Sequence, residues 1–430
     1  MQLVVEDDLR RSRLTVFFRF LLAIPHYFWA SLWTIATFFV AIVQWAYTLA
    51  AGHPSAALHR FMSSYVRYMT HLEAYLYLVG NPYPDFTGEE GEYPIDVTLP
   101  PPAPQKRLVT LVRIFLVLPA LAVTAVLVSG PTVSFTASSS NGGGGVRYSS
   151  RTGGLAAAVA VLGWFSSLAR GRMPKGLRDA GAYSLGYTAQ VLAYLLFVTD
   201  RYPNADPASL LDGVERPPEH PVRLVGDAED LRRSRLTVFF RLLLAIPHFI
   251  WLGLWSIAAV VAVFLNWWVT LFRGTPAAPL HRFLSRFVRY ALHVYAFFFL
   301  VANPFPGFTG ETGSYPLDLV LPEPARQNRW VTFFRLVLAI PAWIVGATLA
   351  WAMVVAAVLT WFVALVRGSA PHGLRNLSAY ALRYQAQTSA YVNLLTDTYP
   401  HSSPLEGGGG QPEAAPELAP VGYGDAPPPG

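Results

Sequence analysis

Histidine is the residue in this chain best suited to bind a metal or relay protons near neutral pH. His26, His59 and His71 recur as His248, His281 and His293, an ungapped shift of 222 positions (248 − 26). Four of them, His26, His71, His248 and His293, form a candidate polar cluster for a metal or proton-relay site. The alternative is hydrogen bonding beside lipid headgroups. We favour the alternative because Glu73, the acid nearest to these histidines in sequence, is replaced by Tyr295 in the later copy.

Arginine pairs form a second candidate site. A pattern of two arginines six positions apart occurs four times, and a proline follows each pair after six more residues. The pairs are Arg13/Arg19, Arg107/Arg113, Arg235/Arg241 and Arg329/Arg335. Guanidinium groups at this density can bind anionic lipid headgroups. They can equally anchor the chain at the membrane surface and stack on aromatic rings, and we favour this second interpretation.

The sequence offers few other residues or motifs that could carry out catalysis or bind a cofactor. The chain has no cysteine, which excludes disulfides, thiolate metal sites and thiol nucleophiles. No phosphate-binding loop, dinucleotide fingerprint or His-Glu-x-x-His motif occurs. We therefore expect no catalytic residue, cofactor or metal, and we expect that the protein is not an enzyme.

The elements that position these residues are repeated as well. Each arginine pair is followed by a tryptophan (Trp45, Trp164, Trp267, Trp361) and a glycine (Gly52, Gly171, Gly274, Gly368), and each copy ends in an aromatic-proline pair. An internal repeat at fixed spacing indicates one structural unit used several times. The predicted units are residues 1–92, 93–216 with a Ser/Gly-rich insertion at 129–154, 217–312 and 313–400, followed by a disordered tail at 401–430.

Composition indicates a membrane protein. The chain is 53% apolar and 13% charged with a mean hydropathy of +0.36, and residues 20–51 and 242–272 contain no acid, lysine or arginine. About 20 apolar residues span a bilayer. The polar insertion at 129–154 falls in the middle of one such run, and basic residues flank the runs on both sides. We therefore expect a helical hairpin of two short spans in each unit, eight spans in all, with both termini cytoplasmic.

The remaining segments complete a mainly α, polytopic fold. Residues 58–79 and 280–301 have the pattern of an amphipathic helix, basic on one side and aromatic on the other, which we expect to lie in the membrane interface. A further span is the alternative, but it would place Arg67 or Arg289 in lipid. One short alternating run precedes each arginine pair, and we expect the four strands to form a small cytoplasmic β-sheet.

This order of features resembles a bacterial membrane family catalogued as domain of unknown function 4389. The closest matches are Arg235–His248 and Leu395–Pro400, and the resemblance covers nearly all of residues 1–400 as tandem copies. It implies a fold but no activity, so it assigns no functional residue. Asn81 and Asn303 stand where the other copies have Asp200 and Asp397, which argues against an obligatory acid at this position.

Two classes of function are compatible with this pattern. The first is a non-enzymatic scaffold or regulatory subunit of the cell membrane that contacts the bilayer, anionic lipids and a membrane or cytoplasmic protein. The second is a small transporter or channel built from parallel repeats. We favour the scaffold because Gln44, Asn266, His26, His248 and a few hydroxyls are the only polar groups within the spans. The net charge of +6 lies beside the spans, so no nucleic-acid partner is expected.

Overall fold

The structure is a computed structural model that describes residues 1–430 except 131, 138–145, 152, 227–230 and 408–430. In the first repeat, strand β1 (Leu3–Val5) precedes helices α1 (Arg13–Leu22), α2 (Ile24–Ala51) and α3 (Ala56–Leu76). The third repeat has β6 (Arg223–Gly226), α9 (Arg235–Phe239), α10 (Arg241–Arg273) and α11 (Ala278–Phe298). The fourth has β7 (Leu317–Val320), α12 (Arg329–Arg367) and α13 (His372–Val392). Each therefore contains a strand, a long apolar helix and a second helix.

The second repeat has the same plan with additions. Strand β2 (Ile95–Val97) is followed by α4 (Arg107–Leu116), α5 (Leu118–Val128), α6 (Leu155–Arg170) and α7 (Lys175–Leu195). The insertion carries the antiparallel strands β3 (Thr132–Ala137) and β4 (Val146–Arg151), and the repeat ends with α8 (Pro207–Leu210) and β5 (Leu211–Asp212). Helices α5 and α6 together correspond to the long helix of the other repeats.

The expected helical hairpins are wrong in the first, third and fourth repeats, because each apolar run is one long helix. Gly253 inside α10 and Gly346 near the middle of α12 do not interrupt these helices, and in all three repeats the chain leaves the long helix at the glycine after it. Gly52, Gly274 and Gly368 adopt φ of 80°, 77° and 72°, the left-handed conformation that ends helices. Within the described residues, three helices are long and apolar enough to cross a membrane, or four if the pair α4–α5, bent by 41°, counts as one. The part of the chain that the structure describes does not contain the eight short spans expected from the sequence.

The second helices, α3, α7, α11 and α13, are central to the structure. They were expected to lie in the membrane interface, but their aromatic side chains Tyr68, Tyr75, Tyr183 and Tyr391 are buried in the protein core. Helix α3 packs against α2 and α7, and α11 packs against α10 and α13. The aromatic face therefore meets protein, not lipid.

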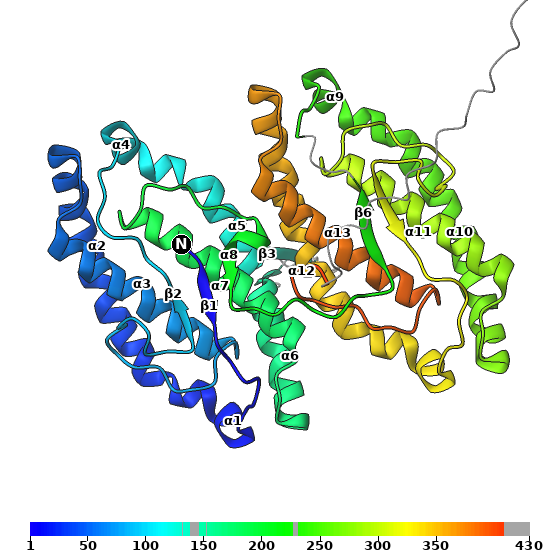
Figure 1. Ribbon diagram of the computed structural model, residues 1–430, viewed down its shortest axis with the longest axis horizontal. Helices are drawn as coiled ribbons and strands as arrows, with labels where there is room; N and C mark the ends of the chain where they lie inside the picture. The colour runs from blue at the N-terminus through cyan, green and yellow to red at the C-terminus, as the bar shows by residue number, and fades with distance from the viewer. Residues whose placement is uncertain (131, 138–145, 152, 227–230, 408–430) are drawn as a thin grey trace, which may run out of the picture.

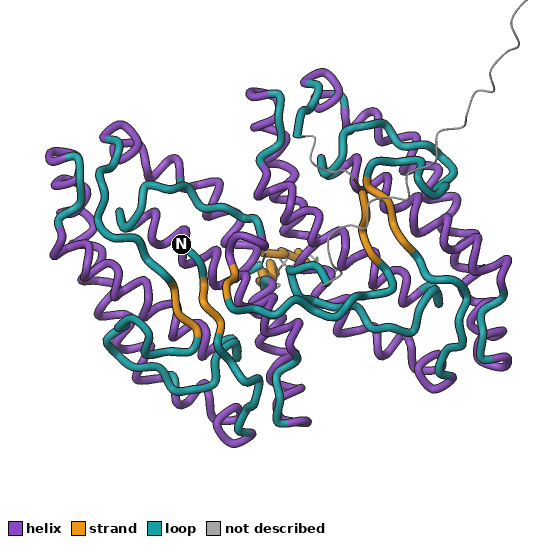
Figure 2. Tube along the Cα trace, in the orientation of Figure 1, coloured by secondary structure: helices purple, strands orange, loops and turns teal. Residues whose placement is uncertain are grey.

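The first and second repeats exchange their strands, and so do the third and fourth, because each strand packs on the second helix of the other repeat. Strand β1 packs on α7 and β2 on α3, while β6 packs on α13 and β7 on α11. Strand β1 pairs with β2 with Leu3 opposite Val97, and β6 pairs with β7 with Leu224 opposite Leu319. The single four-stranded sheet predicted from the sequence is wrong, because the strands form two sheets, β2-β1-β5 and β6-β7, one in each half (Figure 2).

Tryptophan hydrogen bonds join the first repeat to the second and connect the third and fourth repeats in both directions. The Trp45 Nε1 donates to the Thr110 carbonyl at 3.2 Å, the Trp267 Nε1 to Thr332 at 2.8 Å, and the Trp361 Nε1 to Val238 at 3.0 Å. The repeats thus form two intertwined halves, which lie side by side in Figure 1. Helix α12 packs against α5 and α6 and joins the halves.

The start of the predicted tail is ordered. The Tyr380 hydroxyl donates to the Ser402 carbonyl at 2.7 Å, the Arg383 Nη2 donates to the Ser403 carbonyl at 2.6 Å, and both serines are buried. Residues 401–407 therefore belong to the folded part, while the rest of the tail prediction lies outside the described residues.

Candidate functional site

The second arginine of each pair is buried at the end of a helix. The Arg19 Nη1 donates to the carbonyls of Tyr75 and Gly80, where α3 ends, and its guanidinium lies over the Tyr75 ring. The equivalent residues Arg113, Arg241 and Arg335 donate to the carbonyls of Tyr194, Phe297 and Tyr391 in the same way. Helix carbonyls without intrahelical partners favour a cation. The stacking predicted from the sequence is present here, but headgroup binding by these four arginines is not, because their side chains are buried.

The first arginine of each pair is exposed and contacts the partner repeat. Each Nη2 donates to a carbonyl near the end of the partner's long helix at 2.9–3.1 Å. The four bonds are Arg13 to Ala169, Arg107 to Ala50, Arg235 to Val366, and Arg329 to Phe272. These arginines therefore anchor repeat to repeat, and their position beside exposed apolar helices leaves lipid contact open to them.

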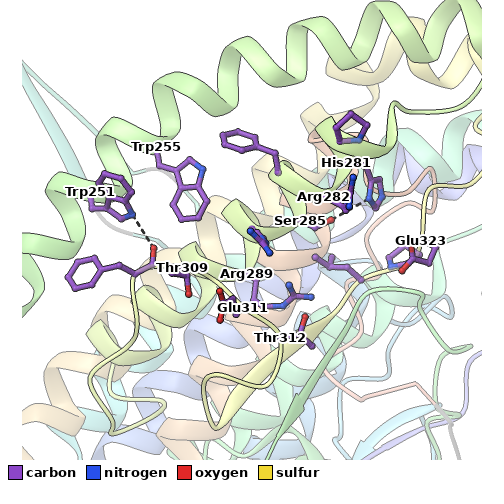
Figure 3. A pocket seen from close by; sticks show the side chains of 16 residues that line it. Trp251, Trp255, His281, Arg282, Ser285, Arg289, Thr309, Glu311, Thr312 and Glu323 are labelled. Atoms are coloured by element: carbon purple, nitrogen blue, oxygen red, sulfur yellow. Dashed lines mark hydrogen bonds between the residues drawn. The ribbon is translucent and has the colours of Figure 1, made fainter.

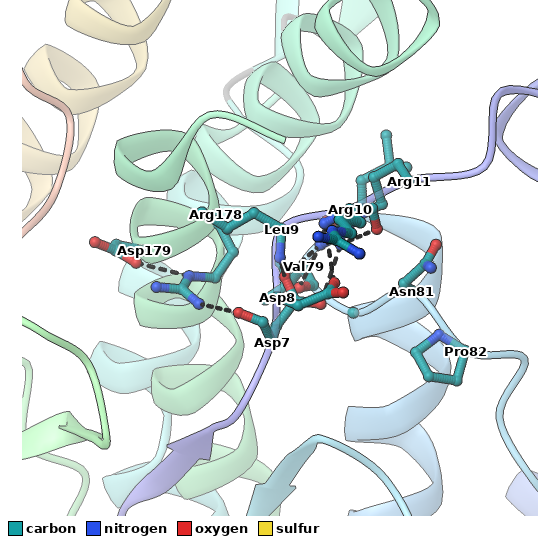
Figure 4. Close-up of polar contacts among 12 residues, drawn as sticks. Asp7, Asp8, Leu9, Arg10, Arg11, Val79, Asn81, Pro82, Arg178 and Asp179 are labelled. Atoms are coloured by element: carbon teal, nitrogen blue, oxygen red, sulfur yellow. Dashed lines mark hydrogen bonds and ion pairs between the residues drawn. The ribbon is translucent and has the colours of Figure 1, made fainter. Parts of the chain in front are cut away.

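A further arginine, Arg11, takes part in the contact between the first and second repeats. The Arg11 Nη2 binds Asp7 at 2.8 Å and donates to the Leu78 and Val79 carbonyls (Figure 4). Arg178 pairs with Asp179 at 2.7 Å and reaches the Asp7 carbonyl at 3.4 Å. This network fastens the segment after β1 to α7 of the next repeat.

The predicted histidine cluster divides into separate local contacts. His26 Nδ1 lies 3.1 Å from the Tyr68 hydroxyl and stacks on Phe86, and His248 makes the same contacts with Tyr290 and Phe308. His71 and His293 instead bind carboxylates on strands. In the described ranges, no group of three or more His, Asp or Glu side chains is arranged to hold a metal ion. The four histidines therefore do not assemble into one site.

The acid partners were missed in the sequence. His71 Nε2 lies 2.9 Å from Asp96, and His293 Nε2 lies 3.2 Å from Asp318. Both histidine–aspartate pairs have the same separation of 25 residues, which is the signal that could have identified them. The pKa of Asp318 lies below its ordinary value. Burial alone would raise this pKa, but the hydrogen bonds from His293 and the Gly313 amide stabilise the carboxylate and outweigh the effect of burial. These pairs hold a strand against a helix.

A cavity of about 660 Å³ opens in the third repeat. Figure 3 shows its three sides: α10 with Trp251 and Trp255, α11 beneath it, and the loop that carries Thr309 and Glu311. Three arginines of α11, Arg282, Arg286 and Arg289, line it. An apolar wall facing several guanidinium groups is suited to an anionic amphiphile.

Comparison with known proteins identifies a family. No curated protein and no solved structure matches the chain. The model of the family described as "Domain of unknown function (DUF4389)" matches residues 13–87, 150–205, 235–309 and 329–403. These four matches cover more than half of the chain and fall one in each repeat, although the match in the second repeat begins after its arginine pair. The protein therefore belongs to the DUF4389 family, with four tandem copies of its domain in one chain.

Proposed function

We propose that this protein is a non-enzymatic scaffold embedded in the cytoplasmic membrane, with its strand-bearing side available to a protein partner. The observation that carries this proposal is the distribution of exposed apolar side chains. They are concentrated on α1, α2, α4–α6, α9, α10 and α12, whereas Tyr295 is the one large apolar side chain exposed among the described residues of α3, α7, α11 and α13.

The exposed apolar surface is far larger than a soluble protein tolerates. Helix α2 buries a narrow stripe that contains His26, Ala30, Thr37, Gln44 and Thr48. Around it, side chains such as Phe28 and Phe38 are 70% and 64% exposed. Apolar patches beyond a few hundred Å² mark interaction sites. A lipid environment accounts for a surface that extends along whole helices and contains no acid.

Contacts along α2 favour an in-plane orientation of the long helices over a crossing one. Trp33 contacts Phe61 and Tyr65 of α3. Trp33 follows Ile24 by nine residues (33 − 24), roughly 14 Å of helix, about half of the roughly 30 Å hydrocarbon core. A crossing α2 that enters at Ile24 would therefore bring the neighbouring exposed Arg60 near the membrane midplane, at a cost of about 2.5–3.5 kcal/mol.

An in-plane orientation avoids this cost. The long helices would lie along one leaflet, with α3, α7, α11, α13 and the strands on the aqueous side. Helices with an apolar face and basic flanks bind membranes in this way. The two basic flanks of each run, first attributed to hairpins, then mark the two ends of one in-plane helix.

The transporter alternative gains no support from the polar residues of the long helices. Gln44 and Asn266 are buried in the stripes through which α2 and α10 meet protein. The Asn266 carbonyl oxygen accepts from the Ala277 amide at 3.0 Å, within its own repeat. These groups take part in helix packing, which is the role a scaffold requires.

Single cysteines test the membrane arrangement, because the chain has none of its own. Glu6→Cys precedes α1 and His53→Cys follows α2, and both positions are exposed. We expect neither to react with an impermeant maleimide in intact cells and both to react after lysis. Ile35→Cys, on the exposed face of α2, should stay unreactive in both samples. Labelling of only one of the first two from outside would show that the helix crosses, and release of the chain from membranes by alkaline carbonate would refute the embedded scaffold.

A further inference from the structure

We propose that the cavity of the third repeat binds the phosphate headgroup of an anionic membrane lipid. This inference rests on the proposed membrane embedding. It concerns a site separate from the four arginine pairs, since the cavity is formed by α10, α11 and the loop before β7.

The basic side of the cavity has one arginine in an ion pair and two without one. Arg289 is tied down, because its Nε lies 3.0 Å from Asp318 and its Nη2 donates to the Leu319 carbonyl. Arg282 and Arg286 are exposed, and within the described residues neither forms an ion pair. They lie four residues apart on one helix face, where like charges repel. An anion between them removes that repulsion, and a guanidinium binds phosphate oxygens through two parallel hydrogen bonds.

The first repeat provides an internal comparison. At the positions 222 earlier, Ser64 replaces Arg286, and Glu90 replaces Thr312. There the Arg67 Nη2 pairs with Glu90 at 2.8 Å, whereas its counterpart Arg289 pairs with Asp318, and no second arginine stands beside Arg60 on the helix face. The third repeat has gained an arginine and lost this acid.

The acids of the cavity set its selectivity. Glu311 and Glu323 also line it, and Glu323 stands where the first repeat has Pro101. With Asp318, the ion-pair partner of Arg289, three arginines face three acids and leave no net charge (3 − 3). The equivalent positions of the first repeat hold Arg60 and Arg67 with Glu89, Glu90 and Asp96, a charge of −1 (2 − 3). The third-repeat cavity is therefore one charge more positive than its counterpart, and the two arginines without an ion pair, Arg282 and Arg286, favour a lipid with net negative charge over a zwitterionic one.

The other side of the cavity suits the glycerol and upper acyl region. Trp251, Trp255 and Phe308 line it, and the Trp251 Nε1 already donates to the Phe308 carbonyl at 3.1 Å. Because its N–H is already bonded, the Trp251 indole offers only its ring carbon atoms to the ligand. Tryptophan is enriched at the level of the headgroups, and α10 continues from here as an exposed apolar surface along which acyl chains can lie.

Lipid retention tests the site. The full chain is purified in a mild non-ionic detergent after reconstitution in vesicles of equal phosphatidylglycerol, phosphatidylethanolamine and phosphatidylcholine, and the retained lipids are quantified by mass spectrometry. We expect phosphatidylglycerol to be enriched. The enrichment should fall about fivefold for each guanidinium removed, in Arg282→Gln and again in Arg282→Gln/Arg286→Gln. The matched control, Arg60→Gln in the first repeat, should retain wild-type enrichment.

The outcomes separate the two proposals. Equal enrichment in the double variant and the wild type would refute the site, as would preferential retention of phosphatidylethanolamine. Displacement of phosphatidylglycerol by millimolar inorganic phosphate would show a phosphate site without lipid selectivity and would also overturn the inference. A variant that stays in the membrane fraction and unfolds at the wild-type temperature confirms that embedding and folding are intact, whereas a wild-type chain absent from membranes would contradict the proposed function instead.

Discussion

The guanidinium carbon of Arg19 lies 4.2 Å from the centroid of the Tyr75 ring, and the same side chain donates to the Tyr75 carbonyl at the end of α3. One residue thus closes the helix, stacks on its last aromatic ring and connects α1 to α3. The same arrangement occurs with Arg113, Arg241 and Arg335, which makes it the contact that defines the repeat.

Replacing this arginine should destabilise the fold. We expect Arg19→Gln to lower the free energy of unfolding by about 2–4 kcal/mol, because buried carbonyls lose a charged donor. Arg19→Lys should recover only part of this, since an ammonium cannot reproduce the planar fork. Arg13→Gln, at the exposed first position, should cost under about 1 kcal/mol. Thermal unfolding in detergent, followed by tryptophan fluorescence, measures all three, and equal losses at both positions would contradict the assignment.

Asp318 should matter more than its equivalent Asp96. Asp318→Asn leaves both Arg289 and His293 without their carboxylate, and we expect a loss of about 2–4 kcal/mol. Asp96→Asn should cost less, because Arg67 is paired with Glu90 in the first repeat. The folded-state pKa of Asp318 is lowered, so its contribution is present above the ordinary pKa and is lost as the pH falls through the folded value. Unfolding of wild type and Asp318→Asn should therefore converge in acid, and a constant difference at all pH values would argue against the ion pairs.

The contribution of Glu73 to stability should depend on pH in the direction opposite to that of Asp318. Burial raises the pKa of this carboxyl on α3 to about 7, so the folded state holds the proton more tightly than the unfolded state. Stability should consequently decrease as the pH rises from about 4.5 to 7. We expect Glu73→Gln to stabilise the protein by about 1–2 kcal/mol at pH 8 and to have little effect at pH 5. A variant without any gain at pH 8 would show that the folded protein solvates the carboxylate.

The exchange of strands between repeats can be trapped by a disulfide. Leu3 of β1 lies opposite Val97 of β2, and paired β-residues can satisfy disulfide geometry. Oxidation of Leu3→Cys/Val97→Cys should yield an intramolecular cross-link that changes migration on a denaturing gel. Leu3→Cys/Leu319→Cys is the matched control, because Leu319 lies in the sheet of the other half, and it should not cross-link within one chain. The reverse result would favour one sheet shared by all four repeats.

The sequence by itself determined the repeat, the helical class and the family, because these depend on local patterns. Apolar runs, the glycines after them and the arginine pairs recur at fixed spacings, and the helices and four repeat strands lie close to the positions expected from them. For the second arginine of each pair, the sequence predicted stacking on an aromatic ring but not the burial of the guanidinium. The residues that flank Arg19 do not show whether its guanidinium contacts lipid or a buried carbonyl.

Only the tertiary structure decided how the repeats combine. Basic residues on both flanks of an apolar run are compatible with a hairpin or with one helix lying in the interface, so the run length alone could not distinguish them. The pairing of β1 with β2, and the contacts of His71 with Asp96 and of Arg107 with Ala50, join residues far apart in the chain. Such contacts depend on which surfaces are buried together, and burial is a property of the packed repeats, not of any one segment.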